Sequence, residues 1–337
     1  GERECNQLWE DILRTGRNDE VSAHFVGSIV YVEKGLYHVS NQSPLLVIDG
    51  QQRLTTVTLL MEALARRLGE EEPLDGFSAK KLRNYYLLNP LEDGDRRYKL
   101  VLSQTDKDSL ISIVDQKPTP KEFSIRVEEN FGFFRDKLAS SASDILSVCK
   151  GLAKLIIVDI SLNRDQDNPQ LIFESLNSTG RELSQADLIR NFILMGLEPE
   201  LQTKLYEQYW RPMEVDFGQE AYPTHFDGFM RHYLTVKTGE IPNVNQVYEA
   251  FKLFARSSIV PGIEELVSDI RTFAKYYCSM ALGAETNTEL KSVFQDLREL
   301  KVDVAYPFLL ELYNDYAHGI LSSKDFLEAV RLVESYV

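Results

Sequence analysis

The sequence predicts an α+β protein in which a small mixed-sheet domain, residues 1–182, precedes an all-helical domain, residues 183–337. Runs of β-branched and aromatic residues, which are typical of strands, lie in the first half of the chain. From Ser184 onward we find no convincing strand, and apolar residues recur every three or four positions, as in amphipathic helices. A length of 337 residues accommodates two domains of ordinary size.

The composition is that of a folded protein without a membrane partner. Apolar residues make up 43% of the chain and charged residues 26%, a balance typical of globular proteins and not of disordered or fibrous ones. No window approaches the roughly 18 uninterrupted apolar residues of a membrane span, and the first residues are too charged for a signal peptide. The three cysteines lie far apart, which fits a reducing compartment. We therefore expect a cytoplasmic protein.

The net charge of −15 limits the ways in which the chain can bind nucleic acid. An acidic surface repels a phosphate backbone unless its basic residues gather in one place. A nucleic-acid role must therefore rest on a local basic groove, on a nucleotide-sized pocket or on residues outside this chain.

The first predicted elements are two strands and a helix. Residues 25–32 (FVGSIVYV) and residues 44–49 (PLLVID) are rich in apolar, β-branched and aromatic residues, so we expect two strands of one sheet. Apolar residues at helical spacing follow over residues 51–68, which predicts an amphipathic helix that the polar run GEEEP ends.

The rest of the first half alternates between helices and strands. We predict helices over residues 79–87, over residues 105–114 and within residues 125–150, with a strand over residues 98–103. Residues 152–162 (LAKLIIVDISL) are β-branched and almost continuously apolar, which favours a buried strand. A helical piece and a glycine turn over residues 177–183 lead to the second half, where we expect seven or eight helices.

The turn DGQQR, residues 49–53, is the strongest candidate site. A strand that gives way to a helix after Gly50 exposes the first N–H groups of that helix, which together with the helix dipole attract an anion. Arg53 in the first turn opposes the dipole at a cost of up to about 1 kcal/mol, so we expect a negative partner. One candidate partner is internal, because Asp49 lies four residues earlier and can pair with Arg53 without any ligand.

The other candidate partner is a nucleotide. Gly50 allows the backbone to approach a phosphate closely, and the two glutamines donate amide hydrogen bonds. Arg53 supplies a bidentate fork, and Asp49 would face a metal ion or a water. This interpretation gives a set of nucleotide-binding residues in the turn: Gly50, Gln51, Gln52, Arg53 and Thr55. The stretch is neither a Walker A motif nor a GxGxxG loop, so its residues alone do not name a reaction.

A second polar cluster surrounds the glycine turn of residues 177–183. Ser184 with Asp187 three residues later forms a variant of the capping box, which is a structural role. If the sheet brings this turn beside DGQQR, Glu174 or Asp187 can hold Mg²⁺ or orient a water, and Asn177 and Arg181 can reach ribose or phosphate.

The basic residues form few clusters, and the best candidate for contact with DNA follows the DGQQR helix. Lys80, Lys81 and Arg83 lie within four residues on a predicted helix. They can contact a DNA backbone, or they can form an ordinary solvated helix face.

Residues 45–64 (LLVIDGQQRLTTVTLLMEAL) closely resemble the IDGQQR signature of the ParB/sulfiredoxin-like domain in the S half of GmrSD-type modification-dependent restriction enzymes. Other pieces agree in order: LWEDI at 8–12, HFVGSIVYV at 24–32, IFESLNSTGRELSQADLIRNFIL at 172–194 and the closing RLVESYV. The resemblance covers most of the chain, although residues 200–325 match only in pattern.

The resemblance implies a domain that binds and hydrolyses a nucleoside triphosphate, GTP or another, with Mg²⁺ held at Asp49. It implies that this domain senses modified DNA and controls an HNH-type nuclease domain or subunit, with Asp49 and Arg53 as catalytic residues. Family proteins usually begin with a YQRxYxW segment and often continue into an HNH domain, and neither signature is present in these residues. We therefore expect part of the pocket and the DNA-cutting residues to lie outside this chain.

Two functional hypotheses follow from different classes of protein, and a third, that the chain is itself the nuclease, is disfavoured because the sequence has no HNH pattern or comparable metal-ligand cluster. The first is a nucleotide-hydrolysing regulatory domain of an anti-phage restriction protein. The second is a non-catalytic sensor, in which the same turn binds a DNA phosphate or a modified base and the helical half signals to a nuclease. The sequence leaves assembly into a homo-oligomer open.

Overall fold

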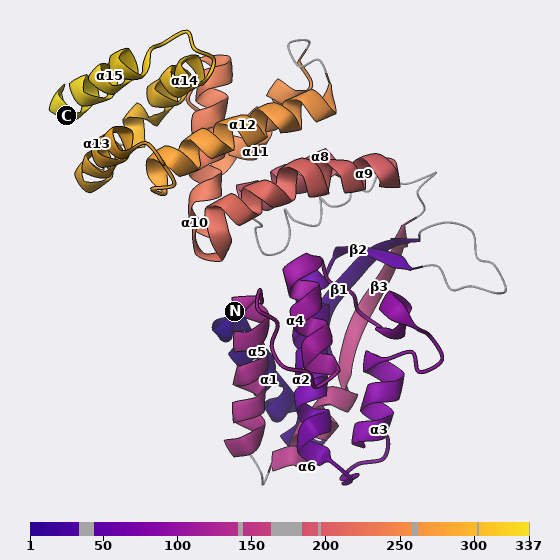
Figure 1. The fold of residues 1–337 in the computed structure, drawn as a ribbon. Helices are drawn as coiled ribbons and strands as arrows, with labels where there is room; N and C mark the ends of the chain where they lie inside the picture. Colours follow the sequence, from indigo (N-terminus) through magenta and orange to yellow (C-terminus); the bar gives the residue numbers. More distant parts are fainter. Residues whose placement is uncertain are drawn as a thin grey trace. The chain divides into compact units, whose positions relative to one another are not determined.

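The computed structural model describes residues 1–33, 44–140, 144–162, 184–194, 197–257, 262–301 and 303–336. The chain divides into two compact units, Gly1–Asp167 and Asn168–Val337, and each is described by itself (Figure 1). The predicted α+β class is confirmed, because a three-stranded sheet lies in the first unit and the described residues of the second unit form helices and turns. The predicted domain boundary at residue 182 lies outside the described residues.

The sheet of the first unit is mixed and has the order β2-β1-β3. Its central strand β1 (His24–Glu33) runs antiparallel to β2 (Leu45–Asp49) and parallel to β3 (Leu155–Leu162). The register of β1 shifts twice, once against each neighbour, and the shift against β3 falls between Phe25 and Gly27. These irregularities change the direction in which nearby side chains point.

The helices of the first unit build a core of their own beside the sheet. In sequence order they are α1 (Glu2–Arg17), α2 (Gln51–Leu68), α3 (Ala79–Leu82), a π-helical turn (Arg83–Leu87), α4 (Gln104–Val114), α5 (Ile125–Ser140) and α6 (Ile145–Ala153). Helix α1 packs against α6, and α2 packs against α5. Trp9, Leu60, Phe134 and Val148 are buried where these helices meet.

Two predictions for the first unit are wrong. Residues 98–103 do not form a strand, because Tyr98 makes only an isolated bridge with Leu88. Strand β3 is not a buried strand: it lies at the edge of the sheet that the described residues form, and Ile156, Ile157 and Val158 are each more than a third exposed. A continuous apolar run is compatible with a strand that is buried on both faces. Whether the strand is buried depends on its position in the sheet. Helix α1 was not among the predicted elements.

The second unit is a bundle of helices in the part of the chain that the structure describes. Its longer helices are α8 (Gln185–Leu194), α9 (Pro199–Leu205), α10 (Arg211–Thr238), α11 (Val247–Ala255), α12 (Ile263–Ala281), α13 (Thr288–Leu300), α14 (Tyr306–Ala317) and α15 (Ser323–Tyr336). Gly218 interrupts α10 with a non-helical conformation. Among the described residues, no helix combines the length and the apolar character that a membrane span requires.

Candidate functional site

The candidate site lies where β2 gives way to α2 (Figure 1). Between Asp49, the last residue of the strand, and Gln51, the first of the helix, Gly50 adopts a left-handed conformation with φ of 93°. A Cβ atom at this position would lie 3.1 Å from the carbonyl oxygen of Ser28 and 3.0 Å from the side chain of Ile29. Both the torsion and the close approach require glycine, so the turn depends on Gly50.

The amino end of α2 carries no side-chain cap and has no acidic residue in its first turn. Its first N–H groups therefore lack a carboxylate partner from within the helix. Gln51 and Gln52 are exposed. The amide of Gln51 donates a hydrogen bond of 2.8 Å to the carbonyl oxygen of Val47, so this side chain is partly engaged. This end of the helix is suited to an anion.

Arg53 binds two neighbours on two different strands. Its Nη2 atom donates to Asp49 Oδ2 at 3.1 Å, and its Nη1 atom donates to the carbonyl oxygen of Ser28. The internal pairing with Asp49 that the sequence left open is therefore present. The side chains of Arg53 and Asp49 nevertheless remain 36% and 34% exposed. Since a guanidinium has five N–H donors, Arg53 keeps donors that a ligand can reach.

Gly27 is a part of the site that the sequence analysis missed. It lies at the register shift of β1 with φ of 124°, and an added Cβ would come within 2.6 Å of Arg53 Nη1. The guanidinium therefore occupies the space that a side chain at position 27 would need. A glycine inside a β-rich run often marks a bulge or a close approach, and that signal was available in FVGSIVYV.

The hydroxyl groups in the first turns of α2 are engaged with their own helix. Thr55 donates to the carbonyl oxygen of Gln51 at 2.8 Å, and Thr56 donates to that of Gln52 at 2.7 Å. These bonds are ordinary for threonine in a helix. The nucleotide-binding role of Thr55 stays a prediction.

The second predicted cluster is described only in part. Three of its members lie outside the described residues: Glu174, Asn177 and Arg181. Asp187 lies in α8 of the second unit. The predicted cap is confirmed, since Asp187 N donates to Ser184 Oγ at 3.1 Å and Ser184 Oγ donates to Asp187 Oδ2 at 2.9 Å. Asp187 also pairs with Arg190 at 3.1 Å. Its contacts in the structure are thus structural, and a role beside DGQQR stays a prediction.

The predicted DNA-binding residues differ in how free their side chains are. Lys81 lies 2.6 Å from Glu72 and 2.9 Å from Asp75, and these hydrogen bonds raise its pKa. Arg83 lies 2.5 Å from the fully buried carboxylate of Glu62. Lys80 is exposed. Lys81 and Arg83 therefore have internal partners, and Lys80 is the member of the cluster best placed to meet a phosphate.

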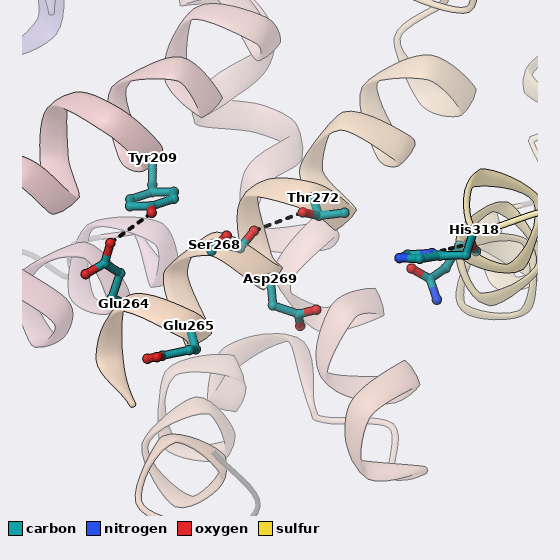
Figure 2. A pocket seen from close by; sticks show the side chains of 8 residues that line it. Tyr209, Glu264, Glu265, Ser268, Asp269, Thr272 and His318 are labelled. Carbon is teal, nitrogen blue, oxygen red and sulfur yellow. Dashed lines mark hydrogen bonds between the residues drawn. The ribbon is translucent and has the colours of Figure 1, made fainter. Parts of the chain in front are cut away.

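The second unit contains an open cavity of about 470 Å³ that the sequence did not suggest (Figure 2). Hydrogen-bonding side chains line it: Tyr209, Glu264, Glu265, Ser268, Asp269, Thr272, Asn314 and His318. Glu264 accepts a bond of 3.0 Å from Tyr209 and pairs with a lysine, and Asp269 accepts one of 2.7 Å from Tyr233. Asp269 also pairs with Lys237 at 2.9 Å, so these two acidic side chains of the wall have internal partners.

Metal binding was expected at Asp49. Within the described part of the chain, no group of three or more His, Cys, Asp or Glu side chains is arranged to hold a metal ion. Mg²⁺, however, is commonly bound by one or two carboxylates together with substrate phosphates. A single, partly exposed carboxylate beside an anion site fits that mode of binding.

Comparison with known proteins identifies one family. The family described as GmrSD restriction endonuclease, N-terminal domain, matches residues 1–194. The match includes the whole first unit and extends through α8 of the second. No curated protein matches the chain.

Proposed function

The chain belongs to the family of GmrSD restriction endonuclease N-terminal domains, and from this we propose that its first unit binds and hydrolyses a nucleoside triphosphate to regulate a nuclease. As a member of this family, the protein belongs to a restriction system. The observation that carries the proposal is the uncapped amino end of α2, beside which Arg53 is held by two strands and is still 36% exposed.

Each residue of the turn has a role in this proposal. Gly50 and the first N–H groups of α2 approach the phosphates, and Gln52 and Arg53 donate to their oxygens. Asp49 bonds Arg53 through Oδ2, so its other oxygen would hold Mg²⁺ together with the phosphates. When bound, Mg²⁺ neutralises phosphate charge. Phosphoryl transfer asks mainly for such positioned cations and donors.

The partners belong to the proposal as well. We expect modified DNA to be the signal and a nuclease domain of the HNH type to be the target of the regulation. Nucleotide turnover in the first unit would then control when the nuclease acts.

Phosphate release tests the proposal. The rate of phosphate release is measured for wild type, Arg53→Ala and Asp49→Ala in preparations of the full-length protein. Each is incubated with Mg²⁺ and a panel of nucleoside triphosphates. We expect Arg53→Ala to slow turnover by about 100-fold or more, since it removes a donor to developing charge. Arg126→Ala, an exposed position on α5, is the control and should retain turnover.

The same experiment separates the alternatives. Turnover by Arg53→Ala at the wild-type rate contradicts the proposal. Nucleotide binding that Arg53→Ala abolishes, without phosphate release by the wild type, favours the non-catalytic sensor instead.

A further inference from the structure

The chain's most basic segment lies in the first unit, after helix α2. Residues 79–99 contain six Lys and Arg against three Asp and Glu, although the whole chain has a net charge of −15. Residues 87–89, in the middle of this segment, lie side by side with residues 96–99 at its end. Asn89 N donates to the carbonyl oxygen of Arg97 at 2.7 Å, the Asn89 amide donates to that of Arg96 at 2.8 Å, and Lys99 N donates to that of Leu87 at 3.0 Å.

Two exposed tyrosines lie on the same segment. Tyr85 and Tyr86 are 63% and 52% exposed, and their rings stand at 85° to one another with centroids 6.4 Å apart. They belong to the π-helical turn Arg83–Leu87, a conformation that is rare and frequent at functional sites. Neither ring is part of the buried core, so the faces of two adjacent aromatic side chains are accessible to a partner.

The turn that presents the tyrosines is firmly held. Leu82 and Leu87 are buried, with exposures of 0% and 2%. Arg83 Nη1 donates to the buried Glu62 at 2.5 Å. These contacts anchor the inner side of the turn, so that the rings of Tyr85 and Tyr86 are presented from a rigid support.

Three cations of the same segment are exposed: Lys80, Arg96 and Lys99. None of the three forms an ion pair with another residue in the part of the chain that the structure describes, whereas Lys81 pairs with Glu72 and Lys107 pairs with Asp95 at 2.7 Å. The acidic residues of the segment, Glu92, Asp93 and Asp95, lie on the loop that joins the two basic ends. The backbone bond between Lys99 and Leu87, the residue after Tyr86, places Lys99 along the tyrosine turn, and Lys80 lies five residues before Tyr85.

We propose that Tyr85 and Tyr86, together with Lys80, Arg96 and Lys99, form a binding surface for single-stranded nucleic acid. Unpaired bases stack on exposed aromatic rings, and nearby cations meet the phosphates of the same strand. A duplex hides the faces of its bases, so a pair of tyrosines adds little to its binding. An acidic peptide would use the cations but not the rings. The proposal does not depend on nucleotide hydrolysis, because it uses no residue of the DGQQR turn.

Fluorescence anisotropy with a labelled oligothymidylate of about 20 nucleotides tests the proposal on the 337-residue chain at low salt. We expect the double variant Tyr85→Ala/Tyr86→Ala to bind at least about tenfold more weakly than wild type, since each base that stacks on an aromatic ring contributes substantially to the free energy of binding. Tyr336→Ala, at a position 92% exposed on α15, is the matched aromatic control and should bind as wild type does.

A charge-reversal variant provides a second test of the proposal. Lys99→Glu should weaken binding and lower the slope of log affinity against log salt concentration, because one phosphate contact is lost. Lys121→Glu makes the same change in net charge at another exposed position of the first unit and should have a much smaller effect. We expect every variant to remain folded, because the substituted positions lie at the surface. Circular dichroism of each variant checks this.

Several outcomes would overturn the proposal. These are the absence of binding by wild type at low salt, equal affinities of the double tyrosine variant and Tyr336→Ala, and tighter binding of a duplex of the same length. Binding of polyglutamate that is insensitive to the tyrosines, without binding of the oligonucleotide, would assign the surface to an acidic protein. Arg53→Ala should retain oligonucleotide binding, so failure here is distinct from failure of the nucleotide proposal.

Discussion

Arg53 is the residue at which local sequence and tertiary contacts meet. Its pair with Asp49 is local, four residues apart, whereas its bond to the carbonyl oxygen of Ser28 joins positions 25 residues apart. The second bond is available because Gly27 leaves room for the guanidinium. The direction in which Arg53 points is thus determined by a neighbouring strand as much as by its own helix.

Replacing Gly27 by Ala should displace Arg53. The new Cβ would come within 2.6 Å of Nη1, so we expect nucleotide affinity to fall by about as much as in Arg53→Ala. Gly76→Ala is the control: Gly76 also has a positive φ, 89°, but an added Cβ there meets nothing within 4 Å. Both variants should lose some stability from backbone strain. Isothermal titration with nucleotide should show a loss only for Gly27→Ala.

The double variant Gly27→Ala/Arg53→Ala shows whether Gly27 affects nucleotide binding by positioning Arg53 or through a general structural effect. If Gly27 acts through Arg53, then Gly27→Ala should weaken binding no further once Arg53 is already Ala. Additive losses in the double variant would mean that Gly27 contributes independently.

At the scale of elements, a buried carboxylate links three parts of the first unit. Glu62 of α2 is fully buried and accepts hydrogen bonds from Arg66 Nε at 2.9 Å and from Arg83 Nη1 at 2.5 Å. Both arginines also donate to carbonyl oxygens near the end of α4, those of Ile113 and Val114. Burial raises the pKa of Glu62, and the hydrogen bonds from the two arginines oppose that shift. One side chain thus connects α2, the π-helical turn and α4.

Glu62→Gln should be strongly destabilising. It leaves two partly buried guanidinium groups without their counter-charge, which typically costs about 3 kcal/mol or more of the free energy of unfolding. Glu72→Gln is the matched control, since Glu72 pairs with Lys81 at the surface and its loss should change stability little. Urea titrations followed by circular dichroism measure both. Equal midpoints for the two variants would contradict the role given to Glu62.

At the scale of the whole molecule, the second unit has an aromatic core that contains a buried histidine. His232 is 7% exposed, and its ring centroid lies 6.3 Å from that of Tyr277 and 5.6 Å from that of Tyr306. Burial lowers the pKa of His232 from 6.5 to about 4, with a smaller upward influence from Asp303 and a downward one from Arg231. The folded protein therefore keeps this histidine neutral.

Stability should fall on acidification because of His232. Between pH 6.5 and about pH 4 the unfolded chain binds a proton that the folded state does not bind, so stability is complete above this window and is lost as the pH falls through it. From about pH 7 to about pH 5 the loss amounts to roughly 2 kcal/mol. Urea titrations at the two pH values measure the difference in the free energy of unfolding. His232→Phe should reduce this difference by that amount. His225→Phe, at an exposed position of the same helix, should leave the difference as it is in wild type.

The sequence by itself determined the elements whose signals are local. The strands at residues 25–32 and 44–49, the helix over residues 51–68 and the cap of Ser184 on Asp187 are all present, because periodicity and capping depend on neighbours within a few residues. The turn from β2 into α2 was also predictable, since Gly50 stands between a strand pattern and a helix pattern.

Only the tertiary structure decided which strand is central, where Arg53 is held and which basic residues are free. Strand β3 was predicted as buried but lies at an edge among the described strands, and Arg83, whose contact with DNA stays a prediction, lies against Glu62, a partner 21 residues away. Tyr98 was predicted to begin a strand, and instead its isolated bridge with Leu88 brings residues 96–99 beside residues 87–89. Strand order and side-chain partners are set by residues tens of positions away, and a local pattern carries no information about which distant segment will pack against it.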